Sequence, residues 1–202
     1  MSALAWILRL ATPPPSVELS AGQVNLRAPR AADYAGWRDA TISSEATLRA
    51  WQPMWPADHL TRAAYRRRLA LFDAERARGT GYAFHLWREG RIEGQIRLSP
   101  VARGARAAGR LGYWVADRAA GQGVATLAVE AVCAFAFERL RLVRVEAAYV
   151  EANAASARVL EKAGFVREGL ARSYVEIAGV RRDHVLVARV REDREGLGRK
   201  GP

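Results

Sequence analysis

The clearest hydrophobic pattern in this 202-residue chain lies just beyond its midpoint, after Gly123. From Val124 to Phe135, apolar side chains recur at intervals of three and four residues, which places them on one face of an α-helix. A helix that opens at Gly123 and buries this face is therefore expected.

Segments with the character of strands lie on both sides of this helix. Four come before it, and the last three of these are separated by a turn at Glu89-Gly90 and by a small basic loop at 102–106. Such a meander forms an antiparallel sheet. The predicted strands are Val24–Ala28, Tyr82–Arg88, Arg91–Val101, Ala107–Ala116, Val143–Val150, and a last hairpin of Phe165–Ile177 and Arg181–Val190 that turns at Ala178-Gly179.

Further helices are indicated by their capping residues. Thr61 is an N-cap for a helix that Gly79 ends, and Asn153 caps a helix that runs through Ala163 before Gly164. A shorter helix is expected over Asp33–Asp39, because two aromatic residues lie three positions apart there. The segment Leu48–His59 contains Trp51, Pro53, Trp55 and Pro56 and is expected to be a loop.

These elements predict one domain at residues 23–191, an N-terminal extension at 1–22 and a polar tail at 192–202. The apolar run Ala3–Leu8 lacks a preceding basic region and is too short to span a bilayer, so we expect no membrane partner. A cytoplasmic protein is expected, either a monomer or a homodimer.

Composition adds two constraints. Lys and Arg exceed Asp and Glu by 32 − 21 = 11, which allows an RNA, a phosphorylated cofactor or an acidic partner, although the arginines are scattered along the chain. The single cysteine, Cys133, excludes an internal disulfide, and the three histidines are too dispersed to predict a metal site.

Candidate chemistry begins where a predicted strand meets the central helix. A glycine-bearing loop and a helix N-terminus bring backbone N–H groups to one point, which suits a pyrophosphate. Gly121 and Gly123 allow close approach of the backbone, and Arg118 can add a charged contact. An ordinary strand-to-helix turn remains the alternative. The residues concerned are Trp114, Val115, Arg118, Gly121, Gln122, Gly123, Val124, Ala125 and Thr126.

A second group follows the next strand. Asn153 is expected to cap its helix, and Ser156 precedes Val159 and Leu160 by three and four residues, so its hydroxyl faces inward with them. That hydroxyl either reaches a ligand beside the helix or bonds back to its own helix.

Taken in order, these motifs resemble the GNAT superfamily of N-acetyltransferases, and most of all its RimJ/RimL type, the ribosomal-protein-alanine N-acetyltransferases. The likeness rests on Gly112–Val115, the full Arg118–Thr126 loop, Asn153-x-x-Ser156, Leu160–Phe165, Glu168-Gly-x-x-Arg172 and Asp183-His184. It implies an α/β (α+β) fold with a mixed, mostly antiparallel sheet of about seven strands, flanked by helices and splayed where acetyl-CoA binds.

The resemblance also implies a mechanism, direct transfer of acetyl from acetyl-CoA to an amine. Backbone groups of Tyr113–Val115 would bind the pantetheine arm and polarise the thioester. Ser156 matches the position that protonates the leaving thiolate. The position of the family's proposed base is Val175 here, and its neighbour Glu176 is the candidate, with a solvated strand carboxylate as the alternative.

The acceptor side is less defined by the sequence. Trp51 and Trp55 either wall the acceptor pocket, as the resemblance implies, together with Tyr113, or pack the first helices onto the sheet. The acceptor is expected to be a protein N-terminus, which leaves open an association with the ribosome. A small amine such as an antibiotic or a polyamine, and a non-catalytic RNA-associated module, are the alternatives.

Overall fold

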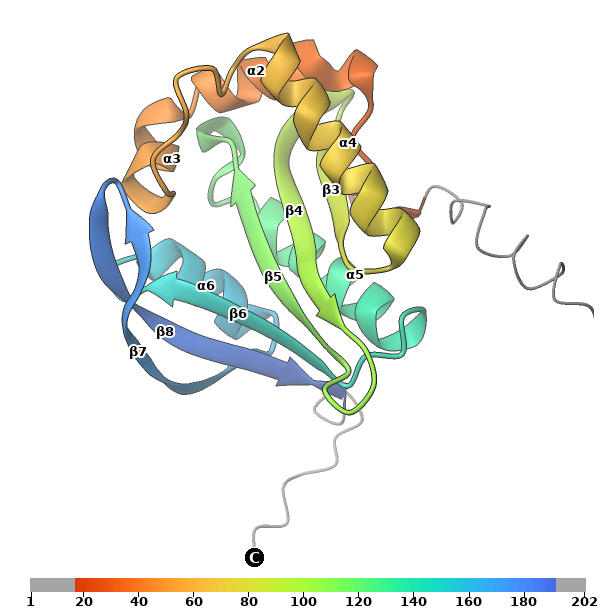
Figure 1. Ribbon diagram of the computed structural model, residues 1–202, viewed down its shortest axis with the longest axis vertical. Coiled ribbons are helices and arrows are strands. Elements are labelled where there is room, and N and C mark those ends of the chain that lie inside the picture. The colour runs from red at the N-terminus through yellow and green to blue at the C-terminus, as the bar shows by residue number, and fades with distance from the viewer. Residues whose placement is uncertain (1–16, 192–202) are drawn as a thin grey trace, which may run out of the picture.

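The computed structural model describes residues 17–191, and these form an open eight-stranded sheet flanked by helices (Figure 1). The sheet order is β1-β2-β3-β4-β5-β6-β8-β7. Every neighbouring pair is antiparallel except β5 and β6, which are parallel. The predicted fold class, a mixed and mostly antiparallel sheet with flanking helices, is confirmed.

The strands are β1 (Glu18–Ala21), β2 (Val24–Arg27), β3 (Tyr82–Arg88), β4 (Arg91–Ala102), β5 (Ala108–Val115), β6 (Arg144–Val150), β7 (Val166–Ile177) and β8 (Val180–Val190). The α-helices are α2 (Tyr34–Ile42), α3 (Glu45–Trp51), α4 (Arg62–Arg78), α5 (Val124–Glu138) and α6 (Ala154–Lys162), with short 3₁₀ turns at Ala31–Asp33 and Asp117–Ala119. Strand β1 falls within the predicted extension and brings the count to eight, one more than the approximate number predicted. Residues 1–16 of that extension and the tail at 192–202 lie outside the described residues.

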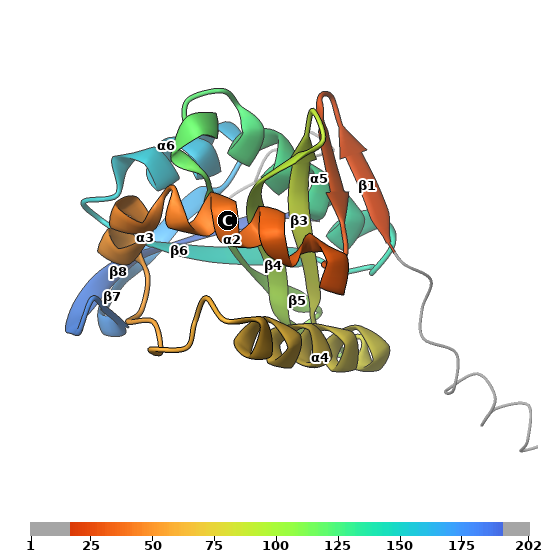
Figure 2. The same ribbon diagram turned by 90° about the horizontal axis from the view of Figure 1, so that it is seen from above.

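The helices form two layers on opposite faces of the sheet. In Figure 2, α5 and α6 lie above the sheet and α4 lies below it. The larger core lies on the α5 side, where Val124, Ala128 and Val132 are completely or almost completely buried. A smaller cluster around Trp37 and Tyr65 packs α2 and α4 onto the other face. The period of the central helix was therefore correctly predicted from its apolar positions.

One prediction fails in the first half of the chain. Residues 48–51 belong to helix α3, whereas the sequence pattern indicated a loop over Leu48–His59. The helix ends at Gln52, whose backbone is extended (φ −119°, ψ 157°). Proline disfavours the helical conformation in the residue that precedes it. Pro53 therefore ends the helix at Gln52 but permits the helical turns before that residue. The predicted loop therefore begins at Gln52 and not at Leu48.

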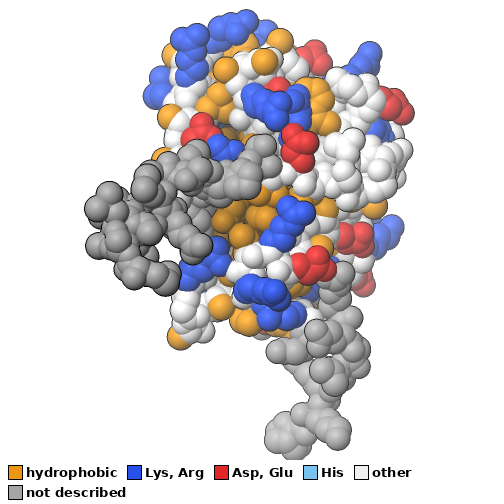
Figure 3. Space-filling model, turned by 90° about the vertical axis from the view of Figure 1, so that its right-hand side faces the viewer, with side chains coloured by type: hydrophobic (Ala, Val, Ile, Leu, Met, Phe, Trp, Pro, Cys, Tyr) orange, Lys and Arg blue, Asp and Glu red, His pale blue; other side chains and the backbone are white. Residues whose placement is uncertain are grey.

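Surface charge is mixed on the face seen in Figure 3, where basic and acidic side chains are interspersed. Opposite charges also pair on α4: Arg76 contacts Asp73 at 2.9 Å, and Glu75 on the same helix contacts Arg97 of β4 at 2.5 Å. The basic excess of the chain is thus partly offset locally, and this face does not present a uniform positive field.

The sheet opens between β5 and β6. The two strands pair only from Ala108↔Arg144 to Arg110↔Glu146. Beyond these pairs β5 continues to Val115 and β6 to Val150, and they no longer bond to each other. Backbone groups along this part of β5 therefore face an opening, as the prediction of a splayed sheet required.

Gly94 of β4 holds the end of β5 in place. It pairs with Val115, and a Cβ atom at this position would lie 2.2 Å from the Trp114 carbonyl oxygen. Such a contact is far inside the van der Waals distance, and the opposing atom belongs to the backbone, which cannot rotate away. Only glycine fits here without moving Trp114 and Val115.

We expect Gly94→Ala to lower the free energy of unfolding by on the order of 2–3 kcal/mol, the upper part of the range for overpacking, because backbone must move. Urea denaturation measures the change. Gly169→Ala on β7 is the matched control, since a Cβ there meets nothing within 4 Å. Equal stability of the two variants would show that β4 does not constrain β5 in this way.

Candidate active site

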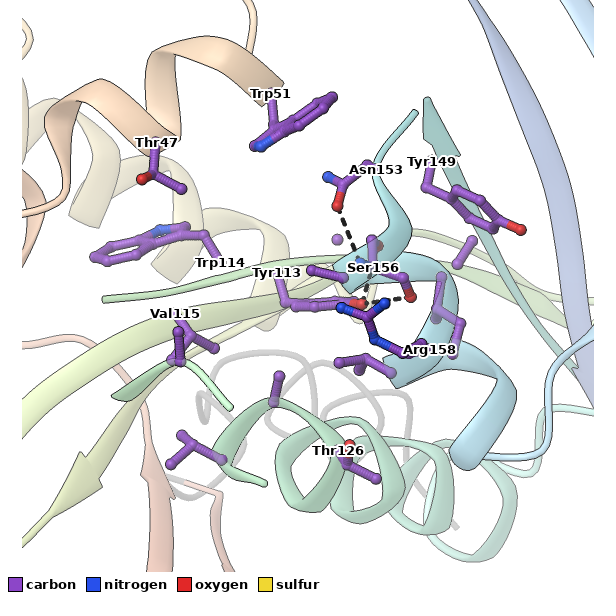
Figure 4. Close-up of a pocket in the computed structure, with 18 of the residues that line it drawn as sticks. Thr47, Trp51, Tyr113, Trp114, Val115, Thr126, Tyr149, Asn153, Ser156 and Arg158 are labelled. Atoms are coloured by element: carbon purple, nitrogen blue, oxygen red, sulfur yellow. Dashed lines mark hydrogen bonds between the residues drawn. The ribbon is translucent and has the colours of Figure 1, made fainter. Parts of the chain in front are cut away.

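A cavity of about 420 Å³ occupies the opening between β5 and β6. Its walls come from both strands, from α3 on one face of the sheet and from α5 and α6 on the other (Figure 4). Among the predicted site residues, those that line it are Trp51, Tyr113, Trp114, Val115, Gly121, Gly123, Val124, Ala125, Thr126, Asn153 and Ser156.

The cavity passes through the sheet from one face to the other. Successive residues of a strand point to opposite faces, so Tyr113 and Trp114 lie on different sides of β5. Tyr113 packs with the core under α5, and Trp114 packs with the cluster around Trp37 on the α2 side. In Figure 4, Trp51 and Trp114 lie on the α3 side of the opening and Thr126 lies on α5. Two ligands can therefore approach each other from opposite faces.

The loop before α5 has the geometry of an anion site. Gly121 and Gly123 have positive φ angles of 73° and 77°, and nothing lies within 4 Å of a Cβ placed at either one. Gly123 is the N-cap residue, so the first turn of α5 directs free N–H groups toward the cavity wall formed by Val124, Ala125 and Thr126. Backbone N–H groups and the helix dipole favour a phosphate there.

Arg118 does not reach this site, contrary to its predicted phosphate contact. Its Nε donates to Glu93 Oε2 at 2.8 Å, and its Nη2 donates to the Ile92 carbonyl at 2.7 Å. The Glu93 carboxylate is 5 % exposed and attracts the guanidinium away from the cavity. Gln122 also points elsewhere, since its amide accepts from Arg88 and donates to the Arg118 carbonyl. Arg118 instead fixes the loop to β4.

A pair of hydroxyl groups, one from α6 and one from β5, joins the helix to the strand. Asn153 Oδ1 accepts from the Ser156 N–H at 3.0 Å, which confirms the predicted cap. Ser156 Oγ lies 3.0 Å from the Tyr113 hydroxyl, and the two share a hydrogen bond (Figure 4). Burial raises the pKa of Tyr113 to about 12, although this hydrogen bond offsets part of the rise. Both hydroxyls therefore keep their protons at neutral pH.

Two cations on α6 also line the cavity, and sequence reasoning missed them. Arg158 and Lys162 are four residues apart, so they lie on one face of the helix. Both residues are exposed, and the anion-binding loop lines the same cavity. The signal in the sequence was their helical spacing after the Asn153-x-x-Ser156 motif.

The two tryptophans of the acceptor side have different environments. Trp51 lines the cavity and is 38 % exposed. Trp55 does not line it, because its ring stacks on His59 with centroids 4.3 Å apart and its Nε1 donates to Gln52 Oε1. Burial lowers the pKa of His59 to about 4, so the stacked imidazole is neutral at physiological pH. The packing interpretation therefore fits Trp55, and the pocket interpretation fits Trp51.

Glu176 is exposed on β7 and does not line the cavity. A bulge does occur before it, because residues 172–174 of β7 stand opposite the single residue Asp183 of β8. Two extra residues leave the alternation of the strand unchanged. Val175 therefore stays on the face of the cavity residue His184, and Glu176 points to the other face.

Cys133 lies inside the core. Burial raises the pKa of its thiol to about 12, so it stays protonated and unreactive. Within residues 17–191, no group of three or more potential ligands is arranged to hold a metal ion. No described helix has the length and hydropathy to cross a membrane.

Comparison with known proteins extends these observations. A family model of the acetyltransferase (GNAT) domain matches residues 23–166. A probable N-acetyltransferase of Bacillus subtilis, YjcK, is 36 % identical over 140 residues, which are 68 % of this chain and 77 % of that protein. The ribosomal protein uS5-alanine N-acetyltransferase of Escherichia coli is 31 % identical over 160 residues, 77 % of this chain and 82 % of that protein.

A solved structure gives the same result. RimJ of Mycobacterium smegmatis, in complex with CoA-disulfide, superimposes with a TM-score of 0.83 at 31 % identity, covering 93 % of this chain and 90 % of that one. These similarities confirm the family resemblance that the motifs indicated.

We expect Arg118→Met to lower the free energy of unfolding by on the order of 2–3 kcal/mol, because it leaves the Glu93 carboxylate buried with a weaker partner. Arg88, at 4.0 Å from Glu93, offsets part of the loss. The double variant Arg118→Met/Glu93→Leu should regain stability in the same denaturation assay. An unchanged unfolding midpoint with a tenfold loss of CoA affinity would instead make Arg118 a phosphate ligand.

Proposed function

The chain belongs to the acetyltransferase (GNAT) domain family, and from this premise we propose that it moves acetyl from acetyl-CoA to the N-terminal α-amine of a protein in the cytoplasm, with a ribosomal protein as acceptor. The observation that carries the proposal is the cavity that crosses the sheet at the β5–β6 opening. The similar uS5-alanine acetyltransferase and the similar RimJ complex with CoA-disulfide support the acceptor and the donor.

The residues on the α5 side fit acetyl-CoA. The pyrophosphate is assigned to the N–H groups at Gly121–Thr126, and Arg158 and Lys162 supply positive charge for the phosphates nearby. The unpaired part of β5 offers peptide groups to the amides of the pantetheine arm, and the same backbone can polarise the thioester carbonyl. Acetyl-CoA supplies the activated acetyl group, and the protein supplies its position.

Proton donation to the leaving thiolate is assigned to Ser156. Its hydroxyl lies beside the cavity and is backed by the Tyr113 hydroxyl, so a proton that leaves Ser156 can be replaced through the 3.0 Å hydrogen bond. The raised pKa of Tyr113 keeps that second hydroxyl protonated. The two residues form a short relay between β5 and α6.

The lining of the cavity favours a peptide α-amine over a small polycation. An antibiotic or polyamine acceptor carries several positive charges and requires carboxylates around it. Among residues 17–191, Asp117 is the single acidic residue in the lining, and its carboxylate already accepts from Thr47 at 3.1 Å. An α-amine has a pKa near ~8, so about a tenth of it is neutral at pH 7 without an acidic pocket.

The first test concerns Ser156. Ser156→Ala should lower kcat and kcat/KM together by about a hundredfold, while CoA affinity stays within about twofold, because the hydroxyl acts mainly in the transition state. Thiol release measures turnover, and calorimetry measures CoA affinity. Ser20→Ala, a matched change at the sheet edge where Ser20 bonds only to Asn25 among the described contacts, should leave both unchanged. Parallel losses of turnover and affinity would reduce Ser156 to a binding group.

The second test concerns the acceptor. At pH 7, kcat/KM for an alanine-starting peptide should exceed that for a blocked lysine peptide by about two orders of magnitude, following the neutral fractions of amines with pKa values near ~8 and ~10.4. The gap should narrow as pH rises, because the lysine becomes neutral later. Thiol release against both peptides and spermidine decides the matter, and a preference for lysine or spermidine would reject the proposed acceptor class.

A further inference from the structure

His184 is the one imidazole in the lining of the cavity within the described residues. It lies on β8, opposite Val150 of β6 and Ala171 of β7, and its residue is 6 % exposed. Its strand register places it on the face of Ala148 and Val150, which also line the cavity. The ring is therefore enclosed by protein and open to the reaction space.

The ring is held in one tautomer. Its Nδ1 lies 3.0 Å from the Arg182 carbonyl oxygen, which can only accept a hydrogen bond. Nδ1 therefore carries the hydrogen in the neutral ring, and Nε2 keeps its lone pair. Tyr174 of β7 packs against the ring at 5.5 Å between centroids and limits its rotation. The result is a fixed imidazole whose basic nitrogen is Nε2.

The other ionisable side chains in the lining are less suited to accept a proton near neutral pH. Tyr113, Tyr149, Arg158 and Lys162 carry types of group that are already protonated there. The remaining group is Asp117, whose carboxylate bonds to Thr47. Imidazole is the side chain whose ordinary titration falls between pH 5 and 8, which is the range in which a general base works best.

The surroundings of His184 carry both signs of charge. Asp183 is occupied by the Ser173 N–H at 2.7 Å, and Arg110 of β5 lies over the Tyr174 ring at 5.7 Å. The other titratable or charged groups on the elements next to it are Arg181, Arg182 and Arg189 on β8, Arg167, Glu168, Arg172 and Glu176 on β7, Tyr149, Glu151 and the Arg144–Glu146 pair on or beside β6, and the Arg49–Glu45 pair of α3.

We propose that His184 is the general base that removes a proton from the acceptor amine, an inference that rests on the proposed acetyl transfer. The ammonium group loses one proton to Nε2, directly or through one water, and this proton then passes to solvent. The amine nitrogen attacks the thioester carbon, so that the C–N bond forms and the C–S bond breaks. The thiolate takes a proton from the Ser156–Tyr113 pair, and the second proton of the nitrogen replaces it.

This assignment gives the site a base on the acceptor side and an acid on the donor side. His184 belongs to the face that Trp114 and Trp51 line, and the Ser156–Tyr113 pair belongs to the face of α5 and α6. The two proton transfers are therefore separated by the sheet opening, so that neither group neutralises the other before the amine attacks.

The test uses the full chain, acetyl-CoA and an alanine-starting peptide. His184→Gln should lower kcat/KM at pH 7 by about a hundredfold, and the acidic limb of its pH profile should disappear. CoA affinity and the unfolding midpoint should stay close to those of the parent. Asp183→Asn is the matched control on the same strand, because its amide oxygen can still accept from Ser173, and its profile should match the parent's.

Chemical rescue separates a base from a packing residue. His184→Ala leaves space for imidazole, and added imidazole should restore activity in proportion to its neutral form. A His184→Gln profile that keeps the parent's acidic limb, or a His184→Ala variant that imidazole does not rescue while it still binds CoA, would overturn the proposal. A parent enzyme that turns over no amine at all would instead overturn the proposed function.

Discussion

The termination of the β5–β6 pairing after Arg110↔Glu146 is the constraint on which the site depends. A parallel pair that continued would use the backbone groups of β5 and close the sheet. Because it stops, one strand presents free peptide groups and its alternating side chains line two separate faces of a single cavity. Donor and acceptor can then meet within the sheet, each held by a different layer of helices.

Because β5 and β6 share no hydrogen bonds along the opening, other contacts have to hold its walls in place. Gly94 lets β4 approach the end of β5, and the Arg118–Glu93 pair ties the glycine loop to β4. Across the opening, the Tyr113–Ser156 hydrogen bond joins β5 to α6. An arginine that looks like a phosphate ligand thus serves the site indirectly, because it sets the position of the loop whose N–H groups face the cavity.

Local sequence signals predicted most of the fold, and their limits are physical. Apolar spacing located α5, and Thr61 and Asn153 marked helix starts because their side chains do cap N–H groups. The same reasoning could not foresee that Glu93, distant in sequence, would capture Arg118, or that Trp55 would stack on His59. Such contacts depend on tertiary packing. The end of α3, residues 48–51, was predicted as loop because tryptophan and proline outweighed the helical turn that precedes Pro53.

The same limit applies to Glu176, the candidate base, which does not line the cavity. Sequence alignment by motif pointed to Val175 and Glu176, and the question was whether a bulge would turn the carboxylate inward. The bulge inserts two residues, which bends β7 but preserves its alternation, so the carboxylate remains outside. Glu176 does not reach the cavity, but the neighbouring strand β8 brings the imidazole of His184 to it. A change of residue type at one strand is thus compatible with the same proton transfer, provided that the neighbouring strand presents a group of suitable basicity on the same face.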